Sequence, residues 1–145
     1  MLGEIKKKLK EKRGFTLIEL VIVIVIILVL SSNLIPQILK YVDKANMASC
    51  KSDAATLLSQ VQVDYVAMQA EEETGVSSIT EVGNVQVAPK DKGEVTAKDV
   101  PDADSAMYHV KSDGSGEVEI SSFAYNNGKY TAVWKNGKWT VKKNK

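Results

Sequence analysis

An unbroken apolar stretch near the start of the chain constrains its fold more than any other feature. Between Phe15 and Leu30 the only polar residues are Thr16 and Glu19. The segment from Phe15 to Pro36 would form about 31 Å of helix, which is enough to cross the hydrocarbon core of a membrane. Because a lone strand cannot satisfy its backbone hydrogen bonds in lipid, we expect a helix despite the many β-branched residues.

A basic segment precedes the apolar one. The first fourteen residues carry five lysines and one arginine against two glutamates, and the remaining 131 residues have a net charge of −3. The positive-inside rule places this leader in the cytoplasm and everything after Lys40 on the far side of the membrane. A secretory signal has its small-residue cleavage site after the apolar stretch, whereas Gly14 lies before it. Cleavage at Gly14 would therefore leave the apolar segment on the mature protein.

After Pro36 the pattern changes from uniformly apolar to amphipathic. Pro36 removes a backbone donor, so we expect a kink or local loosening there, with a complete stop at Ile35 as the alternative. Beyond it, apolar residues recur at steps of three and four, which is typical of a helix that packs on a core. This stripe contains Met47, Cys50, Ala54, Leu57, Leu58, Val61, Tyr65 and Met68. Gly75 is the expected end, with fraying near Ala70 because three glutamates oppose the helix dipole.

Residues 76–145 contain short β-prone runs separated by Gly, Asn, Asp and Ser. The predicted strands are Asn84–Ala88, Glu94–Lys98, Ala106–Lys111, Glu117–Tyr125, Lys129–Lys135 and Lys138–Lys143. Two-residue turns at Asn127-Gly128 and Asn136-Gly137 predict that the last three strands form antiparallel hairpins. Val118 and Ile120 would lie on the wrong face of their strand, so we expect a β-bulge near Ser121-Ser122.

The two turns also predict a register. The second turn places Trp134 opposite Trp139, and the first places Tyr125 opposite Tyr130. Alternation along the strands then brings seven apolar residues to one face, which a slip of one residue would scatter. They are Phe123, Tyr125, Tyr130, Ala132, Trp134, Trp139 and Val141. We expect this face to pack against the helix stripe.

Few side chains indicate catalysis or metal binding. His109 is the sole histidine, and the nearby Ser105 and Ser112 lack the sequence signature of an activated nucleophile. Cys50 is the sole cysteine, so an intramolecular disulfide is impossible and a small buried residue is expected, with a reactive or intermolecularly bridged thiol as the alternative. No enzymatic activity, metal or cofactor is therefore expected.

Charged clusters admit more than one interpretation. Acidic residues around Pro101 and in the loop 113–117 have the oxygen ligands that calcium prefers, but no calcium-loop spacing, so solvated charge is favoured. Lysines near Trp134 and Trp139 are typical of a patch that binds single-stranded nucleic acid. The predicted register turns both tryptophans inward and leaves a basic edge strand, which prevents edge-to-edge pairing. Nucleic acid is therefore not the expected partner.

The segment Lys12-Arg13-Gly14-Phe15-Thr16-Leu17-Ile18-Glu19 resembles the class III signal of type IV pilins and their pseudopilin relatives. The resemblance covers residues 12–30. It implies cleavage between Gly14 and Phe15 by the prepilin peptidase, followed by methylation of the new Phe15 amine. It also implies an α+β fold, in which a long N-terminal helix packs on an antiparallel sheet. Pro36 is similar to the helix-breaking proline of many major pilins.

The same resemblance assigns a role in assembly to Glu19. A carboxylate within the bilayer is costly and usually marks function. In a filament, Glu19 would pair with the Phe15 amine of a neighbouring subunit, which offsets both desolvation costs. The missing C-terminal disulfide is similar to pilins of single-membraned, thick-walled (Gram-positive) bacteria.

The function implied is that of a structural subunit of a type IV pilus, anchored in the cytoplasmic membrane and then polymerised into a surface filament for adhesion, twitching or gliding motility, or biofilm formation. Its expected partners are further copies of itself, the prepilin peptidase and the assembly ATPase and platform. The expected segments are a cleaved leader (1–14), a transmembrane helix (15–39), an amphipathic half (40–74) and a sheet domain (76–145). The alternatives are a pseudopilin of a type II secretion or DNA-uptake system and a monomeric membrane-anchored binding module.

Overall fold

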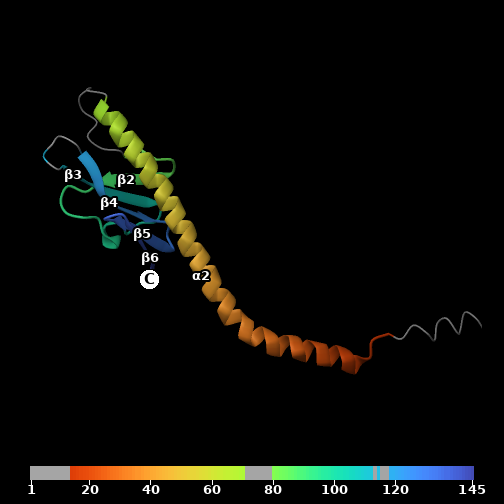
Figure 1. The fold of residues 1–145 in the computed structure, drawn as a ribbon. Helices are drawn as coiled ribbons and strands as arrows, with labels where there is room; N and C mark the ends of the chain where they lie inside the picture. Colours follow the sequence, from red (N-terminus) through yellow and green to blue (C-terminus); the bar gives the residue numbers. More distant parts are fainter. Residues whose placement is uncertain (1–13, 71–79, 113, 115–117) are drawn as a thin grey trace, which may run out of the picture. The chain divides into compact units, whose positions relative to one another are not determined.

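A computed structural model describes residues 14–70, 80–112, 114 and 118–145. The chain forms two compact units, residues 1–42 and 43–145. One long helix, α2 (Leu17–Ala70), begins in the first unit and supplies one layer of the second (Figure 1). The helix continues through Pro36, so the alternative of a complete stop at Ile35 is wrong. Gly75, the expected helix end, lies outside the described residues.

The first unit presents an apolar helix surface. Large apolar side chains between Leu20 and Leu39 are 43% to 66% exposed, because no other described element covers them. Within the described residues, α2 is the one helix long and apolar enough to cross a membrane. Its twenty residues from Leu20 to Leu39 include no charged residue, and they span about 30 Å, the thickness of a hydrocarbon core.

In the second unit, α2 buries the predicted stripe against the sheet. All eight residues of the stripe either belong to the main core cluster or pack against it. Cys50, Ala54 and Val61 are completely buried, and their small size lets the helix approach the strands closely. The Cys50 thiol lies 3.6 Å from the carbonyl oxygen of Tyr130, which confirms it as a buried packing residue. Burial raises the pKa of this thiol.

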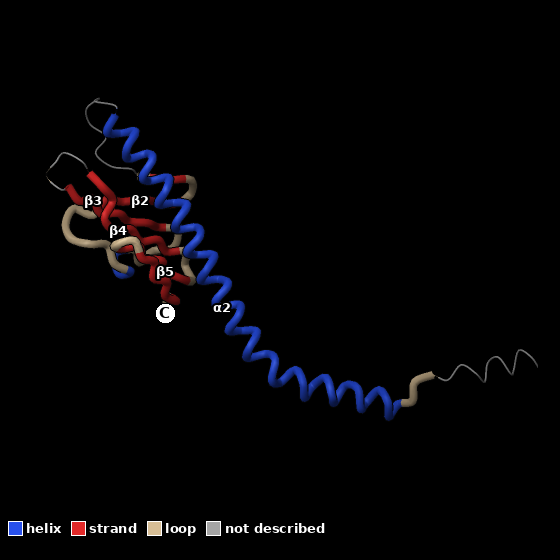
Figure 2. Tube along the Cα trace, viewed as in Figure 1, coloured by secondary structure: helices blue, strands red, loops and turns tan. Residues whose placement is uncertain are grey.

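Six strands form one sheet in the order β1-β2-β3-β4-β5-β6 (Figure 2). They are β1 (Glu81–Val82), β2 (Val85–Pro89), β3 (Ser105–Ser112), β4 (Val118–Asn126), β5 (Tyr130–Lys135) and β6 (Lys138–Lys143). The sheet is not wholly antiparallel as expected, because β2 and β3 pair in parallel. Parallel neighbours need a long crossover, and residues 90–104 provide it. The short β1 was not predicted.

The predicted strand Glu94–Lys98 is wrong. Its last two residues belong to the 3₁₀ helix η1 (Ala97–Asp99), which lies within the crossover. Val95 and Val100 form a second apolar cluster with Ala124 on the face of the sheet opposite α2, which we call the outer face. The Val95 N–H donates to Ser122 Oγ at 2.8 Å instead of joining a strand. The segment covers a sheet face, so it has no neighbouring strand with which to pair.

The hairpin between β5 and β6 has the predicted register, with Trp134 opposite Trp139. Between β4 and β5 the register differs by two residues, since Tyr125 pairs with Ala132 instead of Tyr130. Asn127 causes the difference: its Oδ1 accepts the N–H groups of Lys129 and Tyr130 at 3.1 and 2.8 Å, which widens the loop. A shift of two residues keeps every side chain on its predicted face.

That face forms the core, as predicted. All seven of its predicted residues lie in the main cluster or pack against it. The expected bulge is present in β4, where Ser122 pairs with His109 but Ile120 pairs with Val110. Ser121 is the extra residue, and its Oγ donates to the His109 carbonyl at 3.1 Å. The bulge returns Ile120 to the core face, where it is 3% exposed.

Candidate functional site: the start of the long helix

A reciprocal cap fixes the first turn of α2. The Thr16 N–H and Oγ1 both donate to Glu19 Oε2, at 2.9 and 3.0 Å, and the Glu19 N–H donates to Thr16 Oγ1 at 3.3 Å. This arrangement is a capping box, with Thr16 at the N-cap and Glu19 at the third helical position. The Thr-x-x-Glu spacing is a known sequence signal for such a cap. The sequence predictions for Glu19 concern only membrane function and assembly, so they omit the cap.

The cap holds the Glu19 carboxylate beside the predicted cleavage point. Gly14, Phe15, Thr16 and Glu19 together line one open surface hollow. Glu19 Oε2 accepts both bonds from Thr16, while Oε1 accepts no hydrogen bond and joins no ion pair within the described residues. An ionised carboxylate has about four acceptor positions, so Oε1 can accept a further donor.

Gly14 and Phe15 have no structural role within the described residues. Phe15 is 91% exposed. A Cβ at Gly14 would meet no atom within 4 Å, and the backbone there is not left-handed. The fold of this chain therefore does not require a glycine at position 14. Pro36 lies about 26 Å along the helix from Glu19, so the structure does not bring it to the same site.

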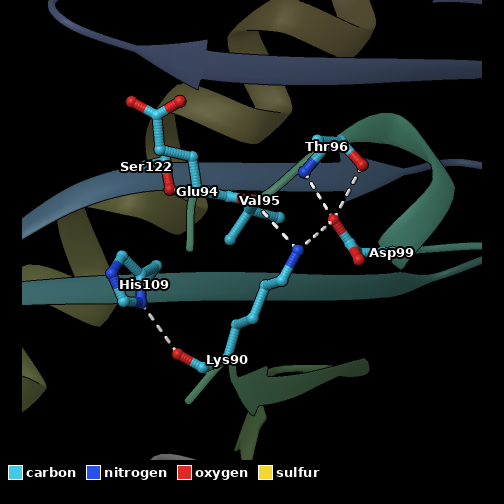
Figure 3. Close-up of polar contacts among 7 residues, drawn as sticks. All are labelled: Lys90, Glu94, Val95, Thr96, Asp99, His109 and Ser122. Carbon is cyan, nitrogen blue, oxygen red and sulfur yellow. Dashed lines mark hydrogen bonds and ion pairs between the residues drawn. The ribbon is translucent and has the colours of Figure 1, made fainter. Parts of the chain in front are cut away.

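A polar cluster on the outer face fixes the crossover (Figure 3). Lys90 Nζ lies 2.7 Å from Asp99 Oδ2, and it donates to the Glu94 carbonyl at 3.0 Å. The same Asp99 oxygen accepts the Thr96 N–H and hydroxyl at 2.7 and 2.8 Å, which forms the cap of η1. Hydrogen bonds from Lys90 and then Thr96 lower the pKa of Asp99 from 3.8 to about 2.

His109 belongs to this cluster and not to a nucleophilic site. Its Nδ1 lies 2.8 Å from the Lys90 carbonyl oxygen, which makes Nδ1 the donor of that bond. Ser105 Oγ donates to the Asp102 carbonyl at 2.6 Å. These contacts hold backbone segments together, and the cluster has the character of a structural network.

A second polar contact fastens α2 to the last two strands. Tyr130 Oη donates to Asp43 Oδ1 at 2.8 Å, and Lys143 Nζ lies 3.2 Å from the same oxygen. The Tyr130 bond, followed by that of Lys143, lowers the pKa of Asp43, and the Asp43 carboxylate raises the pKa of Tyr130. Sequence reasoning missed this contact because 87 and 100 residues separate its partners.

Comparison with known proteins finds a family match near the start of the chain. Residues 9–32 match the family model of the prokaryotic N-terminal methylation motif. No curated protein and no solved structure matches the chain. Within the described residues, the apolar helix is long enough to anchor the chain in a membrane, and it continues into a helix-on-sheet domain. Together, the methylation motif and this architecture support a type IV pilin-like protein. Motif and fold indicate a structural role and not an enzymatic one, with processing by the prepilin peptidase and assembly into a pilus-like polymer.

Proposed function

We propose that this protein is a structural subunit of a type IV pilus. It enters the cytoplasmic membrane with its N-terminus inside, is cleaved after Gly14, is N-methylated at Phe15 and is then polymerised into a surface filament. The proposed segments are a leader (1–14), a membrane helix (15–39), an amphipathic half (40–74) and a sheet domain (76–145). The observation that carries this proposal is the Glu19 carboxylate, held within the matched motif with Oε1 able to accept another donor.

Assembly exchanges one apolar environment for another. The exposed side chains from Leu20 to Leu39 contact lipid before assembly and pack against the helices of neighbouring subunits afterwards. Cleavage creates an amine at Phe15, which donates to Glu19 Oε1 of an adjacent copy. The capping box orients the carboxylate for this contact, because Oε2 remains engaged with Thr16. Loosening of the helix at Pro36 would accompany the change.

Three variants separate the charge of Glu19 from its capping role. Glu19→Gln keeps an acceptor oxygen for Thr16 but removes the charge, Glu19→Ala removes both, and Thr16→Val removes the hydroxyl of the cap while keeping the carboxylate. We expect all three to enter the membrane and to be cleaved. Only Thr16→Val should assemble in normal amounts, because it keeps the carboxylate needed for ionic pairing with the Phe15 amine and the backbone N–H that still holds Oε2.

The measurement is the intact mass and N-terminal peptide of material sheared from cells, together with filament counts by electron microscopy. Abundant filaments whose subunits begin at N-methylated Phe15 would support the pilus subunit. Normal filaments from Glu19→Gln would refute the ionic role and leave only the cap. Full-length protein found only in membranes would refute the whole proposal, and short processed filaments retained in the envelope would indicate a pseudopilin.

A further inference from the structure

The last hairpin of the sheet carries concentrated positive charge. Residues 129–145 contain six lysines and no acidic residue. Lys135 pairs with Glu94, and Lys143 pairs with Asp43. The other four lysines are exposed and join no ion pair within the described residues. We call them the lysine edge: Lys129, Lys138, Lys142 and Lys145.

The lysine edge lies at the end of the second unit where α2 enters it. Contacts along the helix fix this placement. Asp43 binds side chains of β5 and β6, whereas Tyr65, much later in α2, packs edge-on against Tyr108 of β3 with ring centroids 6.3 Å apart. The strand order from β6 to β3 therefore follows the helix from its first residues in this unit towards its end (Figure 1).

Only a few residues separate that end of the unit from the end of the membrane segment. The uncharged segment ends at Leu39, and Asp43 follows four residues later, about 6 Å along a helix. The headgroup layer on one side of a bilayer is of similar thickness, and the Debye length at physiological salt is about 8 Å. Charges beside Asp43 are therefore close enough to a bilayer surface to be attracted by it.

We propose that the lysine edge binds anionic lipid headgroups on the far side of the membrane while the subunit waits for assembly. Trp139 on β6 is half-buried, and tryptophan is a residue type that suits a membrane interface. Each lysine near an anionic surface raises the ratio of lipid-bound to free sheet domains about fivefold. Extraction into a filament breaks these contacts. The inference rests on membrane anchoring and not on filament formation.

The tryptophans of the chain are a fluorescent probe for the contact between the lysine edge and lipid headgroups. Both tryptophans, Trp134 and Trp139, lie on the β5–β6 hairpin, so intrinsic fluorescence reports on that hairpin alone. The full chain is reconstituted into vesicles of phosphatidylcholine, with or without phosphatidylglycerol, that contain a headgroup spin-labelled lipid as quencher. We expect stronger quenching with phosphatidylglycerol at low salt, and loss of the difference when salt is added.

A charge-matched pair of variants tests the residues. The edge variant replaces three lysines of the lysine edge, and the control replaces three exposed lysines elsewhere in the same unit. The edge variant is Lys138→Gln, Lys142→Gln and Lys145→Gln, and the control is Lys51→Gln, Lys92→Gln and Lys111→Gln. We expect the edge variant to lower the ratio of lipid-bound to free sheet domains on the order of 100-fold. The control variant should stay close to wild type.

Two results would overturn the proposal. The first is quenching that is equal in both lipid mixtures, or lowered equally by the edge and control variants. The second is tryptophan fluorescence that changes with a single-stranded oligonucleotide in detergent but not with lipid charge. If the edge variant abolishes that change, the lysine edge would be assigned to nucleic acid. Circular dichroism checks that both variants are folded. Either result leaves the role of Glu19 in assembly to be decided by its own variants.

Discussion

The ion pair between Asp99 and Lys90 gives a quantitative prediction for the outer face of the sheet. The lowering of the Asp99 pKa from 3.8 to about 2 corresponds to an upper bound of roughly 2.5 kcal/mol, at about 1.4 kcal/mol per pKa unit. The side chain is 24% exposed, so solvent screening reduces the contribution to about 1–2 kcal/mol. We expect Asp99→Asn to lose this amount near neutral pH, because the amide cannot pair with the Lys90 ammonium.

The sign of the pH dependence follows from the direction of the pKa shift. The folded-state pKa of Asp99 lies below its unfolded value, so folding favours the ionised carboxylate. The stabilisation is complete above the unfolded value of 3.8 and is lost as the pH falls towards the folded value of about 2. The free energy difference between wild type and Asp99→Asn should therefore shrink over this range.

Urea unfolding of the full chain in a non-ionic detergent, followed by the fluorescence of Trp134 and Trp139, measures this difference. Asp102→Asn is the matched control, because Asp102 is exposed and its side chain joins no ion pair within the described residues. Its unfolding free energy should change by less than about 0.5 kcal/mol. The reasoning fails if Asp99→Asn changes as little as the control does, or if its deficit is the same at neutral and at acidic pH.

Two further substitutions test the core and the end of the sheet. Leu58→Ala should lower the free energy of unfolding by about 2–4 kcal/mol, because Leu58 is 6% exposed in the main core, while Val63→Ala on the exposed face of α2 should change it little. Asn126→Ala should cost roughly 2 kcal/mol, since the buried amide donates to the Val100 carbonyl and accepts the Gly128 N–H, each at 2.8 Å. Thermal unfolding monitored by circular dichroism measures both; a Leu58→Ala variant as stable as Val63→Ala would contradict the packing argument.

Local patterns predicted the parts of the fold that depend on neighbouring residues. The stripe from Met47 to Met68 could be predicted from the period of a helix alone, and it packs on the core as expected. The β5–β6 hairpin could be predicted from its Asn-Gly turn alone, and the bulge at Ser121 from two apolar residues, Val118 and Ile120, that were out of phase with the core face. Each of these features is determined by residues within one or two turns or by directly opposed strands.

The candidate site was predicted unevenly. The motif around Gly14 and Glu19 could be recognised because its residues are contiguous, and the methylation-motif match covers them. The capping box could also have been found, since Thr16 and Glu19 have the spacing that such a cap requires. The contact of Asp43 with Tyr130 and Lys143 could not, because no local pattern connects residues so far apart.

The sequence by itself predicted that the apolar segment after the basic leader forms a helix and continues as an amphipathic one, because a helix is the way for a single segment to satisfy its backbone in lipid. It also determined which side chains of the last strands face the core. Only the tertiary structure decided that residues 90–104 cross the outer face, that β2 and β3 pair in parallel and that β6 lies beside Asp43. These outcomes depend on which distant surfaces bury each other. Burial of Val95 and Val100 over Ala124 outweighs a weak local preference for a strand at Glu94–Lys98.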